Sequence, residues 1–155
     1  MLGFGFLSAI MDKLRMVAPS LAMLTVYFLF QLWNSRNDAP YDEESGPLNV
    51  NTSREWLFLM EEKDLVVVCD FYATWCAPCK RAAPLYTELS NDPKFKKKGV
   101  VFRKCNIDTA APVAVLCKIS QMPTFKVFKG GDEVQTVLGW DEDALRTAIK
   151  EAVRK

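Results

Sequence analysis

Residues 71–80 read Phe71-Tyr72-Ala73-Thr74-Trp75-Cys76-Ala77-Pro78-Cys79-Lys80. They complete and follow a nearly continuous apolar run that begins at residue 65, a pattern typical of a strand covered on both faces of a sheet. The pattern of residues 76–89 then predicts a helix. A Cys-x-x-Cys pair at such a strand-to-helix junction is typical of a redox-active dithiol or of one half of a zinc site.

The other cysteines favour the redox interpretation over zinc. A second half-site is needed for zinc, and Cys105 and Cys117 are too far apart in sequence to form another Cys-x-x-Cys. At the start of a helix, the dipole and the unpaired N–H groups would stabilise a thiolate on Cys76. Cys79 lies one turn further on, so its sulfur can reach that of Cys76. We therefore expect a redox pair and no metal.

The rest of the sequence alternates between helix and strand patterns. Thr52 and Glu55 form a capping box that predicts a helix through residue 62. We expect strands over 65–72, 100–107, 124–129 and 134–138, and further helices over 110–119 and 141–153. On the last helix, the inward-facing residues are expected to be Leu145, Ala148, Ile149 and Ala152. This order predicts an α/β fold with a mixed central sheet and helices on both faces.

Composition excludes several classes of function. The chain has no histidine, which removes Ser-His-Asp and Cys-His catalysis and most catalytic zinc sites. A net charge of +1 gives no reason to expect a nucleic-acid partner. The five cysteines are an odd number, unlike the even set of a small secreted protein held by disulfides. They fit a reducing compartment, or a protein whose thiols carry out its chemistry.

The stretch over residues 71–80 resembles the active-site sequence of thioredoxins. Further motifs of that family occur in the right order between residues 48 and 155: Pro84, the pair Asp70 and Lys104, Met122-Pro123-Thr124 and Gly139. They match the family's helix-kinking proline, buried Lys–Asp pair, cis-proline loop and the glycine after the last strand. The resemblance implies the thioredoxin fold and a thiol–disulfide oxidoreductase that needs no metal or bound organic cofactor.

The resemblance also implies a role for each site residue. Cys76 would be the attacking thiolate and Cys79 the resolving thiol, and the two would form the redox-active disulfide. Asp70 would accept the proton of Cys79, and Lys104 would offset the charge of that carboxylate. Substrate would bind against Trp75, Ala77, Pro78, Met122, Pro123 and Gly139.

These features predict a reductase of protein disulfides that is itself reduced by a thioredoxin reductase or another dithiol donor. Ala77 replaces the glycine of the family's commonest pair, which leaves the reduction potential open. Two alternatives therefore stand: an oxidase or isomerase of an oxidising lumen, and a non-catalytic client-binding or structural subunit of a membrane complex. Cys69 and Cys105 are expected to be core residues, whereas Cys117 is either a core residue or a regulatory thiol.

The N-terminal third has a different character. Residues 1–33 form an apolar segment in which 16–33 is nearly free of polar residues and long enough to span a bilayer. It predicts a helix that anchors the chain as a single-pass membrane protein, with a cleaved signal peptide as the alternative. Residues 34–47 are expected to be a linker and 48–155 the thioredoxin domain. We expect the anchor to lie in a mitochondrial membrane or an endomembrane. The sequence does not determine which side of the membrane the domain faces.

Overall fold

The computed structural model describes residues 23–29, 32 and 40–154. The chain divides into two compact units, Met1–Ala39 and Pro40–Lys155. In the first unit, residues 23–29 are helical and their large apolar side chains are exposed. The expected membrane segment over 16–33 lies mostly outside the described residues. Within the described part of the chain, no helix has the length and apolar character needed to cross a membrane.

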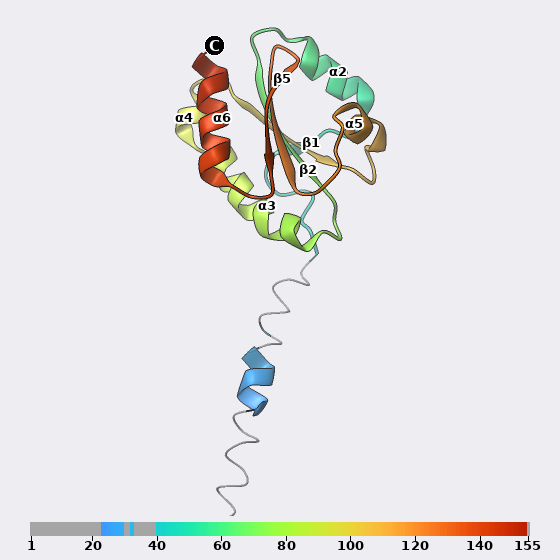
Figure 1. Cartoon of the computed structure of the whole chain (residues 1–155), viewed down its shortest axis with the longest axis vertical. Coiled ribbons are helices and arrows are strands. Elements are labelled where there is room, and N and C mark those ends of the chain that lie inside the picture. The colour runs from blue at the N-terminus through green and yellow to red at the C-terminus, as the bar shows by residue number, and fades with distance from the viewer. Residues whose placement is uncertain (1–22, 30–31, 33–39, 155) are drawn as a thin grey trace, which may run out of the picture. The chain divides into compact units, whose positions relative to one another are not determined.

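A five-stranded sheet forms the centre of the second unit (Figure 1). Across the sheet, the strands lie in the order β1 (Leu48–Asn49), β3 (Val101–Asn106), β2 (Val66–Tyr72), β4 (Thr124–Lys129) and β5 (Asp132–Leu138). The first three are parallel, while β4 runs antiparallel to β2 and β5 antiparallel to β4. The mixed central sheet expected from the sequence is therefore confirmed.

Helices cover both faces of this sheet. One face is packed against α3 (Ala77–Ser90), α4 (Pro93–Lys96) and α6 (Glu142–Arg154), and the other against α2 (Ser53–Glu61) and α5 (Ala111–Leu116). Figure 1 shows these two groups of helices on opposite sides of the strands. The arrangement confirms the thioredoxin fold that the sequence predicts.

Burial on both faces explains the apolar run that leads into the cysteines. All seven residues of β2 are buried. Val66 and Val68 belong to the core under α3 and α6, whereas Val67, Cys69 and Phe71 belong to the core under α2 and α5. Side chains of a strand alternate between faces, so a strand buried on both sides is apolar at nearly every position.

The helix boundaries follow local signals in the sequence. The Thr52 side chain accepts the N–H of Glu55 at 3.2 Å, and the Glu55 carboxylate accepts the N–H of Asn51 at 2.9 Å. The first bond satisfies an N–H group that the first turn of α2 leaves unpaired, and the second ties Asn51, which precedes the N-cap, to the helix. On α6, the four residues expected to point inward, Leu145, Ala148, Ile149 and Ala152, are all buried.

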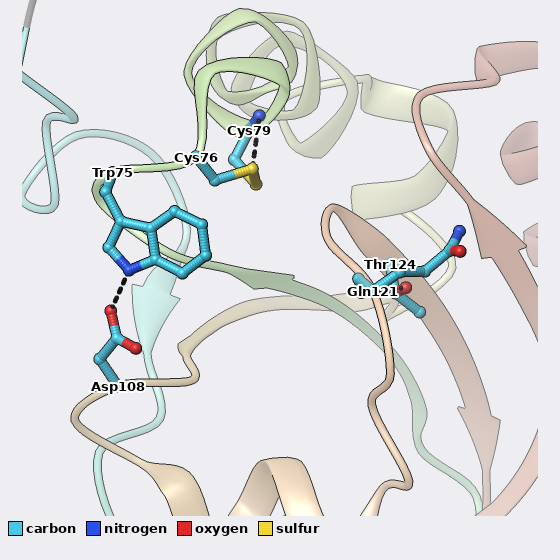
Figure 2. Close-up of a disulfide and its surroundings, with 6 residues drawn as sticks. All are labelled: Trp75, Cys76, Cys79, Asp108, Gln121 and Thr124. Carbon is cyan, nitrogen blue, oxygen red and sulfur yellow. Dashed lines mark hydrogen bonds between the residues drawn. A yellow bond between two sulfur atoms is a disulfide. The ribbon is translucent and has the colours of Figure 1, made fainter.

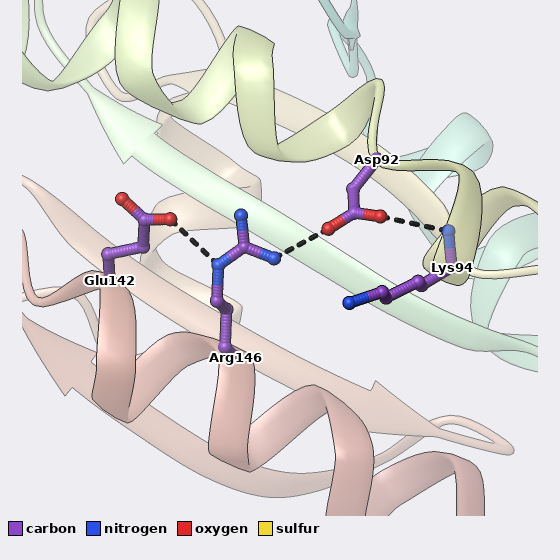
Figure 3. Close-up of polar contacts among 4 residues, drawn as sticks. All are labelled: Asp92, Lys94, Glu142 and Arg146. Atoms are coloured by element: carbon purple, nitrogen blue, oxygen red, sulfur yellow. Dashed lines mark hydrogen bonds and ion pairs between the residues drawn. The ribbon is translucent and has the colours of Figure 1, made fainter.

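Arg146 links α6 to α4, as Figure 3 shows. Its guanidinium donates to Asp92 Oδ2 at 2.6 Å and to Glu142 Oε1 at 2.7 Å. Asp92 also caps α4 by accepting the N–H of Lys94 at 2.9 Å. Because the Arg146 side chain is partly exposed, we expect these ion pairs to contribute little to stability.

The structure differs from the sequence prediction in two elements and one segment. The strand β1 and the helix α4 were not predicted, because two and four residues are too few to show a periodicity. The sequence predicts a linker over residues 34–47, but residues 40–47 belong to the second unit. Tyr41 is buried there against Tyr72, so an acidic, turn-forming composition concealed a segment that contacts the domain.

Candidate functional site

The chain passes from β2 into α3 through a short loop, and the two cysteines lie at the start of the helix. Cys76 is the N-cap residue of α3, and its Sγ accepts the backbone N–H of Cys79 at 3.2 Å. Pro78 occupies the first turn, where a missing N–H costs little. The positive end of the helix dipole and a directed N–H group therefore both act on the sulfur of Cys76.

Cys76 and Cys79 are joined by a disulfide, with their Cα atoms 5.3 Å apart (Figure 2). Cys76 is 6% exposed, whereas Cys79 is 0% exposed. Both cysteines are buried, but only Cys76 keeps some exposed surface. Of the two sulfurs, that of Cys76 is therefore the one open to an incoming sulfur.

Asp70 lies on β2 and is completely buried. Neither of its carboxylate oxygens has a hydrogen-bond partner among the described residues. Burial disfavours the charged form and raises the pKa of Asp70 to about 8, while the positive charge of Lys104 acts in the opposite direction. A carboxyl group with such a pKa can take up or release a proton near neutral pH.

Lys104 lies beside Asp70 in the sheet, where the resemblance implies a buried Lys–Asp pair. The two residues are register partners on β2 and β3. The Lys104 ammonium instead donates to the backbone carbonyls of Ser45 at 2.6 Å and Asp42 at 3.4 Å. Burial lowers the pKa of Lys104, and the nearby carboxylates raise it. Within residues 40–154, no ion pair joins Lys104 to Asp70.

A hollow of about 260 Å³ lies beside the cysteines. It brings together three residues expected to bind substrate, Pro78, Pro123 and Gly139. The Met122–Pro123 peptide bond is cis, as the resemblance predicts, and the N–H of Gly139 donates to the Pro123 carbonyl at 2.9 Å. Met122 packs against the cluster of buried residues that contains both cysteines.

The other expected contact residues surround the disulfide without lining this hollow. Ala77 is exposed on the first turn of α3. Trp75 is 64% exposed, and its indole N–H donates to Asp108 Oδ2 at 2.8 Å (Figure 2). Trp75 is therefore held at the rim by a polar contact and not by burial. Figure 2 shows Gln121 and Thr124 across the site from Trp75. The Thr124 hydroxyl donates to the Gln121 carbonyl at 2.8 Å and closes the loop that carries Pro123.

Sequence analysis missed several residues of this site. Asp108 holds Trp75, and the hollow is also lined by Arg81, Ala82, Leu85 and Trp140. Arg81 and Leu85 lie three and seven residues after Pro78 on α3, so a helical projection from Pro78 could have found them. Asp108 lies 33 residues from Trp75 in the sequence, and no local pattern points to it.

The three remaining cysteines are free thiols in the core under α2 and α5. Burial raises the pKa of Cys105 and of Cys117 to about 12, and it raises that of Cys69 well above its usual range. A protonated thiol is a poor nucleophile. The core interpretation of Cys69 and Cys105 is confirmed, and Cys117 is buried as well. Among the described residues, no group of three or more His, Cys, Asp and Glu side chains could hold a metal ion.

Comparison with known proteins gives consistent matches. The family model described as Thioredoxin matches residues 48–151. Thioredoxin 1 of Plasmodium falciparum (isolate 3D7) is 41% identical over 101 residues, which cover 65% of this chain and 92% of that protein.

Two solved structures extend the likeness to the fold. The thioredoxin of Malassezia sympodialis superposes with a TM-score of 0.63 at 31% identity, covering 72% of this chain and 95% of that one. The oxidized form of mitochondrial thioredoxin 3 from Saccharomyces cerevisiae gives a TM-score of 0.59 at 33% identity, covering 68% and 94%. The range matched by the family model includes both cysteines, Asp70, Lys104 and Pro123. The likeness therefore concerns the site as well as the fold, and the chain belongs to the thioredoxin family.

Proposed function

We propose that this chain reduces protein disulfides by thiol–disulfide exchange at Cys76 and Cys79. The observation that carries the proposal is the disulfide between Cys76, which caps α3 and keeps some exposed surface, and Cys79, which is completely buried one turn further on. Membership of the thioredoxin family supports it, because thioredoxins reduce protein disulfides and are recharged by a thioredoxin reductase.

The reaction begins from the reduced dithiol. The Cys76 thiolate, stabilised by the helix N-terminus and the Cys79 N–H, attacks one sulfur of a substrate disulfide. A bond forms between that sulfur and Cys76, the substrate S–S bond breaks, and its electron pair leaves on the other substrate sulfur. Cys76 is then held in a mixed disulfide with the substrate.

The second step releases the substrate. Cys79 gives its proton to the Asp70 carboxylate, directly or through water, and its sulfur attacks Cys76. The bond between Cys76 and the substrate breaks, and the electron pair leaves on the substrate thiolate. Two electrons have then passed from the dithiol to the substrate, and the chain carries the Cys76–Cys79 disulfide. A thioredoxin reductase or another dithiol donor returns it to the dithiol.

The groove for a substrate protein is assigned to the surface around the disulfide. Trp75, Ala77 and Pro78 would form one side, while Met122, Pro123 and Gly139 would form the other. Exposure of Trp75 and the hollow beside Pro78 and Pro123 support this assignment.

The direction of electron flow depends on the reduction potential, which Ala77 would influence. A reduction potential as low as that of a reductase would distinguish this chain from an oxidase or isomerase.

We also propose that residues 1–33 anchor the chain in a membrane as a single-pass segment. The apolar composition of 16–33 supports this, as do the exposed apolar side chains of helical residues 23–29. The redox unit would then begin at residue 40. A mitochondrial membrane or an endomembrane is the proposed location, and the likeness to a yeast mitochondrial thioredoxin supports the former.

Covalent trapping tests the redox function. Cys79→Ser should accumulate substrates on Cys76, because the attack proceeds while resolution cannot. Cys76→Ser should trap almost none and abolish disulfide reduction. The measurement is a pull-down of each variant followed by release with a reductant. Cys117→Ser is the matched control, because its buried thiol should leave trapping unchanged.

Two results would contradict this function. Equal trapping by Cys76→Ser and Cys79→Ser would show that the nucleophile is wrongly assigned. A Cys76→Ser, Cys79→Ser double variant with full cellular function would favour the non-catalytic binding subunit.

A further inference from the structure

Residues 41–45, which we call the strap, lie against the buried side of the redox site. Tyr41 is 8% exposed and stacks on Tyr72, with ring centroids 4.1 Å apart and planes inclined by 12°. Tyr41 also belongs to the cluster of buried residues that contains Cys76 and Cys79. A segment that precedes the first strand therefore forms part of the wall around the cysteines.

Glu43 ties the strap to the ends of two central strands. Its Oε1 accepts hydrogen bonds from the Tyr72 hydroxyl at 2.7 Å and from Asn106 Nδ2 at 2.8 Å. Tyr72 and Asn106 are the last residues of β2 and β3 and are register partners. The strap is thus fixed at the point where the chain leaves the sheet for the cysteine loop.

The strap also holds the ammonium group of Lys104. Lys104 Nζ donates to the carbonyls of Ser45 and Asp42 and lies 5.6 Å from the ring centroid of Tyr41 and 6.0 Å from that of Tyr72. These contacts hold the Lys104 ammonium group on the side of the strap. As a result, no donor from residues 40–154 bonds to the buried oxygens of Asp70, although Lys104 is the cross-strand neighbour.

We propose that the strap is a positioning element of the redox reaction: it covers the Asp70 carboxyl group and holds Lys104 away from it, and so sets the pH at which Cys79 can give up its proton. The proposal rests on the proposed role of Asp70 as the proton acceptor. It assigns a function to residues 41–45, which lie outside the range matched by the thioredoxin family model.

Several titratable groups interact electrostatically with Asp70. They are Tyr41 of the strap, Cys69 and Tyr72 of β2, Tyr86 of α3, and Lys104 and Cys105 of β3. Burial raises the pKa of each of these tyrosines and cysteines, so they stay neutral near neutral pH. Cys79, the proton donor, faces the same cluster from α3. Among the described residues, Lys104 is therefore the charged group that can stabilise the Asp70 carboxylate.

Loosening the strap should favour the ionised form of Asp70 in two ways. Water would reach the carboxyl group, which reduces the cost of desolvation, and Lys104 would be free to turn toward it. Both changes lower the pH at which Asp70 ionises. Since only the carboxylate can accept the proton of Cys79, resolution of the mixed disulfide should then reach its full rate at a lower pH.

The test follows Asp70 directly in the full chain, in its disulfide form, by an NMR titration of the Asp70 carboxyl carbon. Tyr41→Ala should lower the midpoint by about one pH unit. The matched control Tyr41→Phe keeps the stacked ring and should leave the midpoint unchanged. Tyr41→Leu keeps an apolar side chain over Tyr72 and should give a smaller shift in the same direction, which covers a failure of Tyr41→Ala to fold.

A double-mutant cycle tests the part played by Lys104. Lys104→Met should raise the Asp70 midpoint more in the Tyr41→Ala background than in the wild type, because the ammonium is free to approach only in the former. Equal effects in both backgrounds, or unchanged midpoints in both Tyr41→Ala and Tyr41→Leu, would overturn the proposal.

The rate of resolution separates this inference from the function on which it rests. In the wild type, the rate should rise with pH through the Asp70 midpoint, and Asp70→Asn should remove that rise. If Asp70→Asn keeps the rise, the role of Asp70 is wrong, and the strap does not set the pH of the reaction. If Asp70→Asn removes the rise but Tyr41→Ala does not move it, only the strap inference fails.

Discussion

Asp70 is a carboxyl group placed where a charged group is costly. It is completely buried, no described residue forms a hydrogen bond with its carboxylate, and burial raises its pKa to about 8. In the unfolded chain the value is about 3.9. As pH rises above about 4, the unfolded chain releases this proton while the folded protein keeps it. The folded state therefore loses stability between about pH 4 and about pH 8.

We predict that Asp70→Asn removes this loss. The variant and the wild type should have similar free energies of unfolding near pH 4. The variant should then become more stable relative to the wild type by about 1.4 kcal/mol per pH unit, up to about 4 kcal/mol at pH 7. Urea unfolding of both proteins across this range measures the difference. Parallel stability profiles would mean that Asp70 does not titrate with a raised pKa.

The helix α6 shows how one element supports the site from a distance. It covers the sheet face shared with α3, the helix that carries both cysteines. Ile149 is 0% exposed in that core, whereas Thr147 is exposed on the opposite side of the same helix. Packing of the buried stripe, rather than the partly exposed ion pairs of Arg146, should hold α6 in place.

We predict that Ile149→Ala lowers the free energy of unfolding by about 2–5 kcal/mol, because it leaves a cavity under the sheet. Thr147→Ala, the matched control, should change it by less than about 0.5 kcal/mol. Denaturant unfolding of the two variants provides the comparison. A loss below about 1 kcal/mol for Ile149→Ala would show that the core can collapse around the missing atoms.

At the scale of the whole molecule, the chain combines a redox unit with an apolar segment of different character. The compact unit Pro40–Lys155 contains the complete sheet, both cysteines and the strap. The proposed anchor precedes it. The two parts should therefore be separable by truncation, with the redox chemistry retained by the second.

We predict that the full chain fractionates with membranes and resists extraction by alkaline carbonate. A fragment of residues 40–155 should stay in the supernatant and still reduce a protein disulfide, because its core closes without the first unit. Sedimentation of membranes followed by immunoblotting distinguishes the two. Release of the full chain by carbonate, or a mature N-terminus beyond Trp33, would contradict the anchor and favour a cleaved signal peptide.

Much of the fold could be predicted from the sequence because its signals are local. The buried run before Cys76, the capping box at Thr52 and the buried stripe of α6 each reflect the period of one element. The Cys-Ala-Pro-Cys motif and the resemblance to thioredoxins likewise identified the redox pair and the cis-proline loop. What escaped prediction was short or distant: β1, α4, and the contact between Trp75 and Asp108.

The contacts of the strap could not be predicted from the sequence. The sequence by itself determined the order of the longer elements and the chemistry of the cysteines, because periodicity and motif spacing depend on neighbouring residues. It predicted a solvated linker where the folded chain places Tyr41 on Tyr72 and Glu43 across two strand ends. Only the tertiary structure decided that Lys104 turns to Ser45, which lies 59 residues away, instead of to Asp70. The direction of a long side chain depends on which donors and acceptors surround it after folding, and those come from segments far apart in the sequence.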